Sequence, residues 1–416
     1  MKHTSGMWWS AACLIAAGSV LALSACTPTS HQPSAVPEVR IGLLGALSGP
    51  GAATGQEAVR GAELAALVVN QVQSLPVPLS TRAGLPGLGG AKIRILRADT
   101  GADPDKAAAM ATSLVARQHV AGLVSADSAA ATAMASERTE RIGVPFLGSV
   151  ASADFLTERG LDWFFRVTPT DQTIAEACLA LIAQTGAGTA ERIGIVHADD
   201  AASNDAATAV QALAKEAGDE IAKNVEFGSG QDARPAVGIL HGAAPDAVVA
   251  VAARSGDASA LLTAGALSGG TRPLSLAIGR GFTPQTVRQA IQAAGGKVLH
   301  GTVWSQDFAQ RNLAADAVAG LYQRRFNAPM TEAAAETFTA VLTLAQAVDS
   351  ARSLDAQAIR TALLGLNVPG RDTIMPWGGI RFDQTGQNVQ AAGLVEEITP
   401  DVAHVVFPGE LAANSS

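Results

Sequence analysis

From Val39 onward, short apolar runs alternate with longer amphipathic or alanine-rich segments. Runs of this kind, bounded by turn residues, predict buried β-strands, and the segments between them predict helices. The predicted strands are 39–44, 92–99, 120–124, 144–148, 163–167, 192–196, 220–227, 246–251, 273–278 and 297–304. The predicted helices are 55–70, 103–118, 127–141, 171–185, 202–217, 232–241, 257–268, 284–294, 312–327, 332–351 and 355–364, and a strand-like tail follows from Asp372.

Regular alternation of strands and helices predicts an α/β fold with parallel sheets that carry helices on both faces. The strands are too many for one comfortable sheet, so two open, Rossmann-like lobes fit the pattern best. Open α/β sheets bind ligands beyond the carboxyl ends of their strands. Two such lobes facing each other would enclose a cleft.

The first strand-to-helix turn is rich in glycine and raises the question of phosphate binding. Gly55 is followed by Gln56 and Glu57, so the lysine and hydroxyl of a Walker loop are missing. Gly49 and Gly51 begin a dinucleotide pattern, but Thr54 stands at its third position. The start of the helix still offers unpaired N–H groups to a hydroxyl, a carboxylate or a phosphate. A turn without any ligand is the other reading of this stretch.

Composition and motifs exclude several classes of protein. The net charge of −8 argues against nucleic acid, which requires a basic face. The histidines are scattered, no cysteine pair has zinc-site spacing, and no G-x-S-x-G elbow is present. We therefore expect no metal, no cofactor and no enzymatic activity.

The N-terminus predicts export. Lys2 and His3 precede an apolar run, and the run ends in Leu23-Ser24-Ala25-Cys26, which is the order of a secretory signal. A cysteine after Leu-Ser-Ala resembles the bacterial lipobox, which implies lipidation of Cys26 after removal of residues 1–25. Residues 26–38 are rich in Pro, Ser and Thr and indicate a tether. A retained membrane helix is the alternative. Cys178 lies alone in an apolar helical run and is expected to be a buried small hydrophobe.

Four fragments in this order resemble the type I solute-binding proteins of bacterial ABC transporters, in the branched-chain amino-acid (Leu/Ile/Val) binding family. They are "GALSGPGAATGQEAVRGAELAALVVN", "LGGAKIRILRADTGADPDKAAAMATSLV", "GVPFLGSVASADFLTERGLDWFFRVTPTDQ" and "WGGIRFDQTGQN". The resemblance implies two lobes joined by three crossovers, near Val167, Gly301 and Asn367. The N-terminal lobe would hold 39–166 plus 301–366, and the C-terminal lobe 167–300 plus 367–416.

The same resemblance implies where the first lobe grips a carboxylate. Ser128, at the start of a helix, and Ser152, in "VAS" after the next strand, match the two hydroxyl positions of the family, and Val150 begins the second motif. Thr54 would line the cleft from the glycine-rich turn. A helix N-terminus with two hydroxyls suits a carboxylate. Plain helix capping is the competing interpretation of both serines.

The second lobe departs from the family pattern. Ala202 or Ser203 stands where the family often has a tyrosine, and Arg280 lies near the acid that pairs with a substrate ammonium. Arg254 or Arg280 in the cleft would favour a second carboxylate or a phosphate. Asp257 could still receive an ammonium. Trp304 is expected at the second crossover, as a cleft wall or a core residue.

The resemblance therefore implies a lipid-anchored protein on the extracytoplasmic face of a bacterial membrane. It would capture a small polar organic solute as a monomer and deliver it to an ABC permease. A sensor that signals to a membrane receptor without transport is the alternative, and loss of affinity is a third possibility. Because the ammonium partners are absent from the pattern, we expect leucine, isoleucine and valine to bind poorly, and an acidic or amide-bearing solute to bind better.

Overall fold

The computed structural model describes residues 38–185, 192–267, 274–294 and 296–412. The predicted signal peptide, Cys26 and almost all of the predicted tether lie outside the described residues. None of the described helices combines the length and the apolar character that crossing a membrane requires.

The first sheet has the strand order β2-β1-β3-β4-β5, and every neighbouring pair is parallel. Its strands are β1 (Glu38–Gly45), β2 (Lys92–Asp99), β3 (Gly122–Ala126), β4 (Phe146–Gly148) and β5 (Phe164–Arg166). One face carries α1 (Ala52–Asn70) and α12 (Glu332–Ala351), which pack on each other, and the other face carries α2 (Pro104–Gln118) and α3 (Ala129–Glu140). Helices cover both faces, as the alternating pattern predicts.

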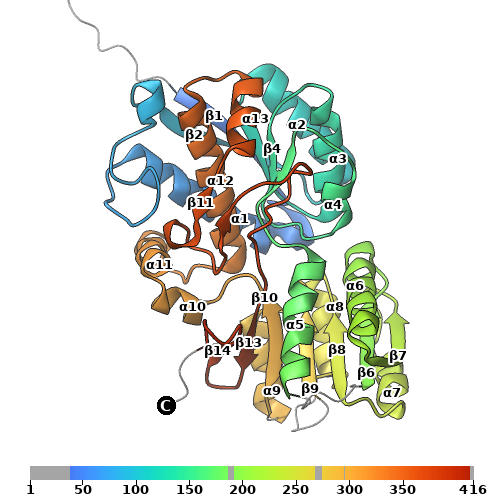
Figure 1. The fold of residues 1–416 in the computed structure, drawn as a ribbon. Helices are drawn as coiled ribbons and strands as arrows, with labels where there is room; N and C mark the ends of the chain where they lie inside the picture. Colours follow the sequence, from blue (N-terminus) through green and yellow to red (C-terminus); the bar gives the residue numbers. More distant parts are fainter. Residues whose placement is uncertain (1–37, 186–191, 268–273, 295, 413–416) are drawn as a thin grey trace, which may run out of the picture. The chain divides into compact units, whose positions relative to one another are not determined.

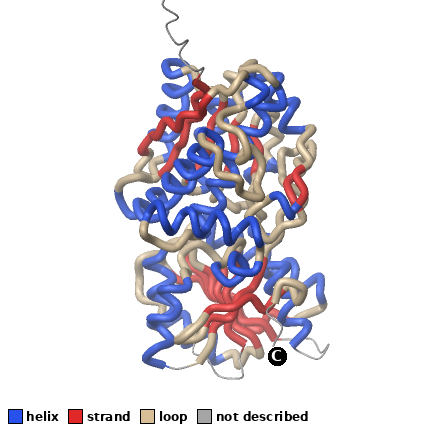
Figure 2. The backbone as a smooth tube through the Cα atoms, turned by 90° about the vertical axis from the view of Figure 1, so that its left-hand side faces the viewer, coloured by secondary structure: helices blue, strands red, loops and turns tan. Residues whose placement is uncertain are grey.

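The second sheet has the order β14-β13-β10-β9-β8-β6-β7. Its parallel strands are β6 (Arg192–Ala198), β7 (Glu220–Phe227), β8 (Ala247–Val251), β9 (Leu274–Ile278) and β10 (Val298–Thr302). The antiparallel edge is formed by β13 (Leu394–Ile398) and β14 (Ala403–Phe407). Figure 2 shows the strands of this sheet with helices on either side: α5 (Asp171–Thr185) and α6 (Ala201–Ala217) on one face, and α7 (Arg234–Gly242), α8 (Ser255–Thr263) and α9 (Pro284–Ala294) on the other.

These two mainly parallel sheets confirm the predicted α/β fold with two lobes. Local signals place several helices correctly. Asp103 accepts a hydrogen bond from the Lys106 N–H at 3.0 Å and precedes Pro104 at the start of α2. Cys178 is buried as predicted, and burial raises the pKa of its thiol to about 12.

The chain passes between the two sheets three times: after β5, after β10 and before β13. The remaining elements are α4 (Phe155–Glu158), α10 (Gln306–Arg311), α11 (Leu313–Phe326), α13 (Ala356–Leu364), β11 (Val368–Pro369), β12 (Gly379–Ile380) and short 3-10 turns at Gly49–Gly51, Pro86–Leu88 and Gly370–Asp372. Part of the segment assigned to the C-terminal lobe contacts the first sheet. The Arg166 N–H donates to the Gly386 carbonyl at 2.8 Å, and the Asn388 N–H donates to the Arg166 carbonyl at 3.0 Å.

Candidate functional site

Thr54 and Ser128 each follow a strand of the first sheet. Thr54 lies in the first turn of α1, after β1, and is exposed. Ser128 follows β3 and caps α3, where its hydroxyl accepts a hydrogen bond from the Ala131 N–H at 3.3 Å. Ser128 therefore caps α3, as the competing interpretation expected. Ser128 is also exposed and lies beside the N–H groups of the first turn of α3.

Val150 and Ser152 lie in the loop after β4. Val150 is buried, whereas Ser152 is partly exposed. The Ser152 carbonyl accepts the Asp171 N–H at 2.9 Å. Burial raises the pKa of Asp171 to about 6, and a hydrogen bond from the Ser152 side chain partly opposes the rise. Ser152 thus joins the loop of the first lobe to the start of α5 in the second.

Arg166, at the end of β5, is fully buried and holds the loop after β4 in place. Its Nη1 donates to the carbonyls of Ser152, at 3.0 Å, and Ala153, and its Nη2 donates to Thr157 Oγ1 at 2.9 Å. Its Nε donates to Gln387 Oε1 at 2.6 Å. Burial lowers the pKa of Arg166 to about 10, although nearby carboxylates oppose the change. A guanidinium with so many acceptors holds the position of Ser152 firmly.

Arg254 and Asp257 follow β8 in the second sheet and both contact the turn after β7. Asp257 is buried, and its two carboxylate oxygens accept the Ser229 hydroxyl at 2.6 Å and the Gly230 N–H at 2.7 Å. The exposed Arg254 donates from Nη1 to Ser229 Oγ at 3.1 Å. The carboxylate that could receive an ammonium therefore already holds the turn after β7.

Arg280 follows β9 and reaches α12, which packs on the first sheet. Its Nη1 lies 2.6 Å from Glu336 Oε2 and its Nη2 lies 2.7 Å from Glu336 Oε1, a bidentate ion pair. Arg280 Nη1 also lies 3.3 Å from Glu332 Oε1. Arg280 was expected to receive an anionic group of the ligand. In the structure its guanidinium is already paired with the carboxylates of Glu336 and Glu332.

Thr168, which follows β5, completes this cluster. Its hydroxyl donates to Glu336 Oε1 at 2.5 Å. Residues that follow strands of both sheets therefore meet on one carboxylate, which is wholly inaccessible to solvent. Burial raises the pKa of Glu336 to about 7 and outweighs the lowering by Arg280. Burial alone would lower the pKa of Arg280, but the carboxylates of Glu336 and Glu332 raise it.

The turn that presents Arg280 has no room for side chains at its glycines. Gly279 has φ +107°, and a Cβ there would lie 2.5 Å from the Ala252 carbonyl oxygen. A Cβ on Gly281 would lie 2.4 Å from the Arg254 carbonyl oxygen. The turns after β8 and β9 consequently pack backbone against backbone, which fixes where Arg280 begins.

Trp304 belongs to the core rather than to an open surface. It is buried, and its Nε1–H donates to the Ile374 carbonyl at 3.0 Å. Ser203 is one of the two residues that stand where the family often has a tyrosine. Its hydroxyl donates to Asp200 Oδ2 at 2.7 Å and accepts the Ala253 N–H at 3.0 Å. Asp200 caps α6 by accepting the Ser203 N–H at 3.2 Å, and the Ser203 hydroxyl ties this helix to the end of β8.

Sequence reasoning missed Glu336, Glu332, Asp171, Thr168 and Arg166. One signal was available for Glu336. The stretch from Ala333 to Val348 in α12 is almost entirely buried, and Glu336 is its only acidic residue. A carboxylate in an otherwise apolar or small-residue helix requires a partner, because an unpaired buried charge is very costly.

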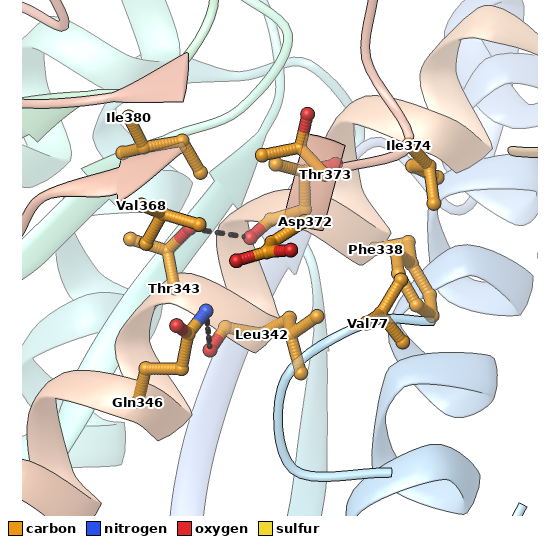
Figure 3. Close-up of a pocket in the computed structure, with 11 residues that line it drawn as sticks. Val77, Phe338, Leu342, Thr343, Gln346, Val368, Asp372, Thr373, Ile374 and Ile380 are labelled. Atoms are coloured by element: carbon orange, nitrogen blue, oxygen red, sulfur yellow. Dashed lines mark hydrogen bonds between the residues drawn. The ribbon is translucent and has the colours of Figure 1, made fainter. Parts of the chain in front are cut away.

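Two further features of the described part of the chain bear on ligand binding. No group of three or more His, Cys, Asp or Glu side chains there could hold a metal ion. Figure 3 shows a small cavity between α12 and the segment after β11, where Phe338, Gln346, Asp372 and Ile374 are among the lining residues. Its volume of about 10 Å³ suits no more than a water molecule.

Comparison with known proteins extends over nearly the whole described chain. A family model described as "Periplasmic binding protein" matches residues 38–399. The Leu/Ile/Val-binding protein homolog 7 of Brucella abortus (strain 2308) is 25% identical over 409 residues, which cover 93% of this chain and 97% of that protein.

Solved structures share the fold at low sequence identity. A substrate-binding protein of an ABC transporter from Desulfitobacterium hafniense, in complex with Leu, superposes with a TM-score of 0.68 at 21% identity and covers 89% of this chain and 100% of that one. A solute-binding protein from Rhodopseudomonas palustris BisB5, in complex with 3,4-dihydroxybenzoic acid, gives a TM-score of 0.66 at 18% identity, with coverage of 86% and 92%.

Proposed function

Because this chain belongs to the periplasmic binding protein family, whose members bind solutes and do not catalyse reactions, we propose that it captures a small polar organic solute between its lobes and delivers it to an ABC permease. The observation that carries the proposal is the cluster at Glu336 on α12, where Thr168, which follows a strand of the first sheet, and Arg280, which follows a strand of the second, contact the same carboxylate. Binding at the carboxyl ends of strands is the general rule for open α/β sheets.

We propose an amino acid or a related carboxylate or amide as the solute. The two similar proteins of known structure were solved with leucine and with 3,4-dihydroxybenzoic acid, both of which carry a carboxylate. Ser128 and Ser152 are the residues we assign to this carboxylate, together with the first-turn N–H groups of α3 and a contact from Thr54. Val150 would support the loop from beneath.

The opposite end of the solute is assigned to Glu332 on α12. Its side chain is 24% exposed, and Glu332 and Glu336 together carry one negative charge more than Arg280 neutralises when both are ionised. Such a carboxylate suits an ammonium or an amide N–H donor. Weak leucine binding was expected because the sequence lacks the family's ammonium partners in the second lobe. That expectation did not take into account the acids of α12, Glu332 and Glu336.

A hinge motion would open and close the site, with ligand contacts to both lobes favouring the closed form. The hinge segments are proposed near residues 167, 301 and 367. The third could extend as far as β13, because Gly386 and Asn388 contact β5. The lipid at Cys26, the tether and a monomeric state complete the proposal.

The test is a thermal-shift screen of the purified protein against amino acids, amides, dicarboxylates and aromatic acids. A solute at about 100 times its dissociation constant should add about 2.7 kcal/mol to the free energy of unfolding. Calorimetry on each hit, repeated with Ser152→Ala and Glu332→Gln, assigns the two ends of the solute. Binding that is indifferent to both substitutions would place the solute elsewhere and refute the assignment.

A further inference from the structure

A larger hollow than the cavity beside α12 lies in the second lobe and is lined mainly by polar side chains. It lies between α6 and the strands β6 and β7, which Figure 1 draws side by side. Its volume is about 280 Å³. The lining residues are His197, Asn204, Ala207, Thr208, Gln211, Asn224 and Glu226. None of them belongs to the cluster around Glu336 or to the residues assigned to the solute.

The lining is polar where a helix and a sheet normally pack through apolar side chains. Asn204, Thr208 and Gln211 stand at positions i, i+4 and i+7 of α6 and so share one face of this helix. Asn224 and Glu226 alternate along β7, the edge strand, and share one face of the sheet. Polar side chains of α6 and of β7 thus line the same hollow.

Two of these groups lack partners. The side-chain oxygens Oδ1 of Asn204 and Asn224 are buried and accept no hydrogen bond. A buried acceptor left unpaired is costly, so such atoms are rare in folded proteins. Water or a ligand with hydrogen-bond donors can reach both oxygens from the hollow.

The other lining groups add acceptors. His197 Nδ1 lies 3.0 Å from the Ala198 carbonyl oxygen, which only accepts, so Nδ1 carries the hydrogen. In the neutral ring Nε2 is then an acceptor. Glu226 contributes a carboxylate, and neither lysine nor arginine lines the hollow. The hollow is open to solvent at the exposed residues Thr208 and Glu226, and it has room for a small organic molecule.

We propose that this hollow is a second binding site, separate from the interlobe site, and that it takes a small organic ammonium ion. An ammonium brings several N–H donors and the positive charge that Glu226 favours. The two unpaired amide oxygens and the carboxylate would receive the donors. A neutral alcohol supplies one donor only, and an anion would be repelled by Glu226.

The test uses three probes of one shape: propylammonium, propan-1-ol and propionate, each titrated into the full chain and followed by NMR. Propylammonium alone is expected to saturate. Asn224→Asp should tighten its binding by about tenfold, because a charge-assisted hydrogen bond is roughly twice as strong as a neutral one. Asn224→Leu should weaken binding by about tenfold or more, since it removes the acceptor.

Lys223→Met is the matched control. It also makes the net charge more negative by one, but Lys223 alternates with Asn224 and lies on the opposite face of β7. This control should leave the affinity within about twofold, because an exposed charge is screened by salt. Melting curves confirm that each variant folds.

Several results would overturn the proposal. They are equal binding of propan-1-ol, binding of propionate, no saturation by any probe, or an Asn224→Asp variant no tighter than Lys223→Met. Propylammonium binding that is lost in Glu332→Gln but kept in Asn224→Leu would place the cation between the lobes, and would also refute the second site. Because this site does not depend on the interlobe solute, failure of the screen above leaves it unaffected.

Discussion

Replacing Arg280 with methionine should destabilise the protein and weaken the junction of the two lobes. Methionine keeps much of the apolar stem but removes the guanidinium that lies 2.6 and 2.7 Å from the Glu336 oxygens. Glu336 would remain fully buried, with the Thr168 hydroxyl as its remaining donor. Removing one partner of a buried ion pair typically costs about 3–5 kcal/mol. The remaining hydrogen bond places the expected loss near the lower end, about 3 kcal/mol.

The loss should depend on pH. In the wild type the pKa of Glu336 is already raised from 4.5 to about 7, so the folded state binds a proton more readily than the unfolded chain. Without Arg280, which lowers this pKa, it rises further. Ionisation of Glu336 then opposes folding more strongly, so the cost of Arg280→Met grows as the pH rises through about 7 and shrinks toward about pH 5.

Urea unfolding followed by tryptophan fluorescence, at about pH 5 and about pH 8, measures this difference. The double variant Arg280→Met/Glu336→Met removes both charges and should recover most of the lost stability, because a buried pair and an apolar pair are often equivalent. X-ray scattering of each variant reports whether the lobes separate. A single variant within about 0.5 kcal/mol of the wild type would refute the reasoning, because so small a change is ordinary for surface substitutions. A double variant as unstable as the single one would show that packing, not charge, matters here.

Three further outcomes are expected. Ser152→Ala should weaken solute binding by about 1–3 kcal/mol, measured by calorimetry, and a loss of stability without a loss of affinity would leave Ser152 as a structural partner of Asp171. Asp171→Asn should flatten the pH dependence of stability. The pKa of Asp171 in the folded protein, about 6, exceeds the ordinary 3.8, so Asp171 makes the free energy of unfolding fall by about 1.4 kcal/mol per pH unit as the pH rises between these values. Melting temperatures that change with pH equally in variant and wild type would contradict this. Cys26→Ser should abolish incorporation of a fatty-acid analogue, and equal labelling of both proteins would exclude the lipid anchor.

Local periodicity was enough to predict the fold. Buried parallel strands are continuous apolar runs, and covering helices repeat their apolar face every three to four residues, so both leave a mark within one short segment. The start of α2 at Asp103-Pro104 is another local property, because a cap satisfies N–H groups only two or three residues away. The order of four such fragments was sufficient to indicate the family.

Tertiary structure alone decided the chemistry of the lobe junction. Arg280 and Glu336 are 56 residues apart, and Thr168 is 168 residues from Glu336, so no local pattern connects them. The sequence places Arg280 after a strand, but its charge is available to a ligand only if no carboxylate lies nearby. The packing of α12 on the first sheet brings that carboxylate there. Burial then determines its pKa, because desolvation depends on every atom that surrounds the group and not on its neighbours in the chain.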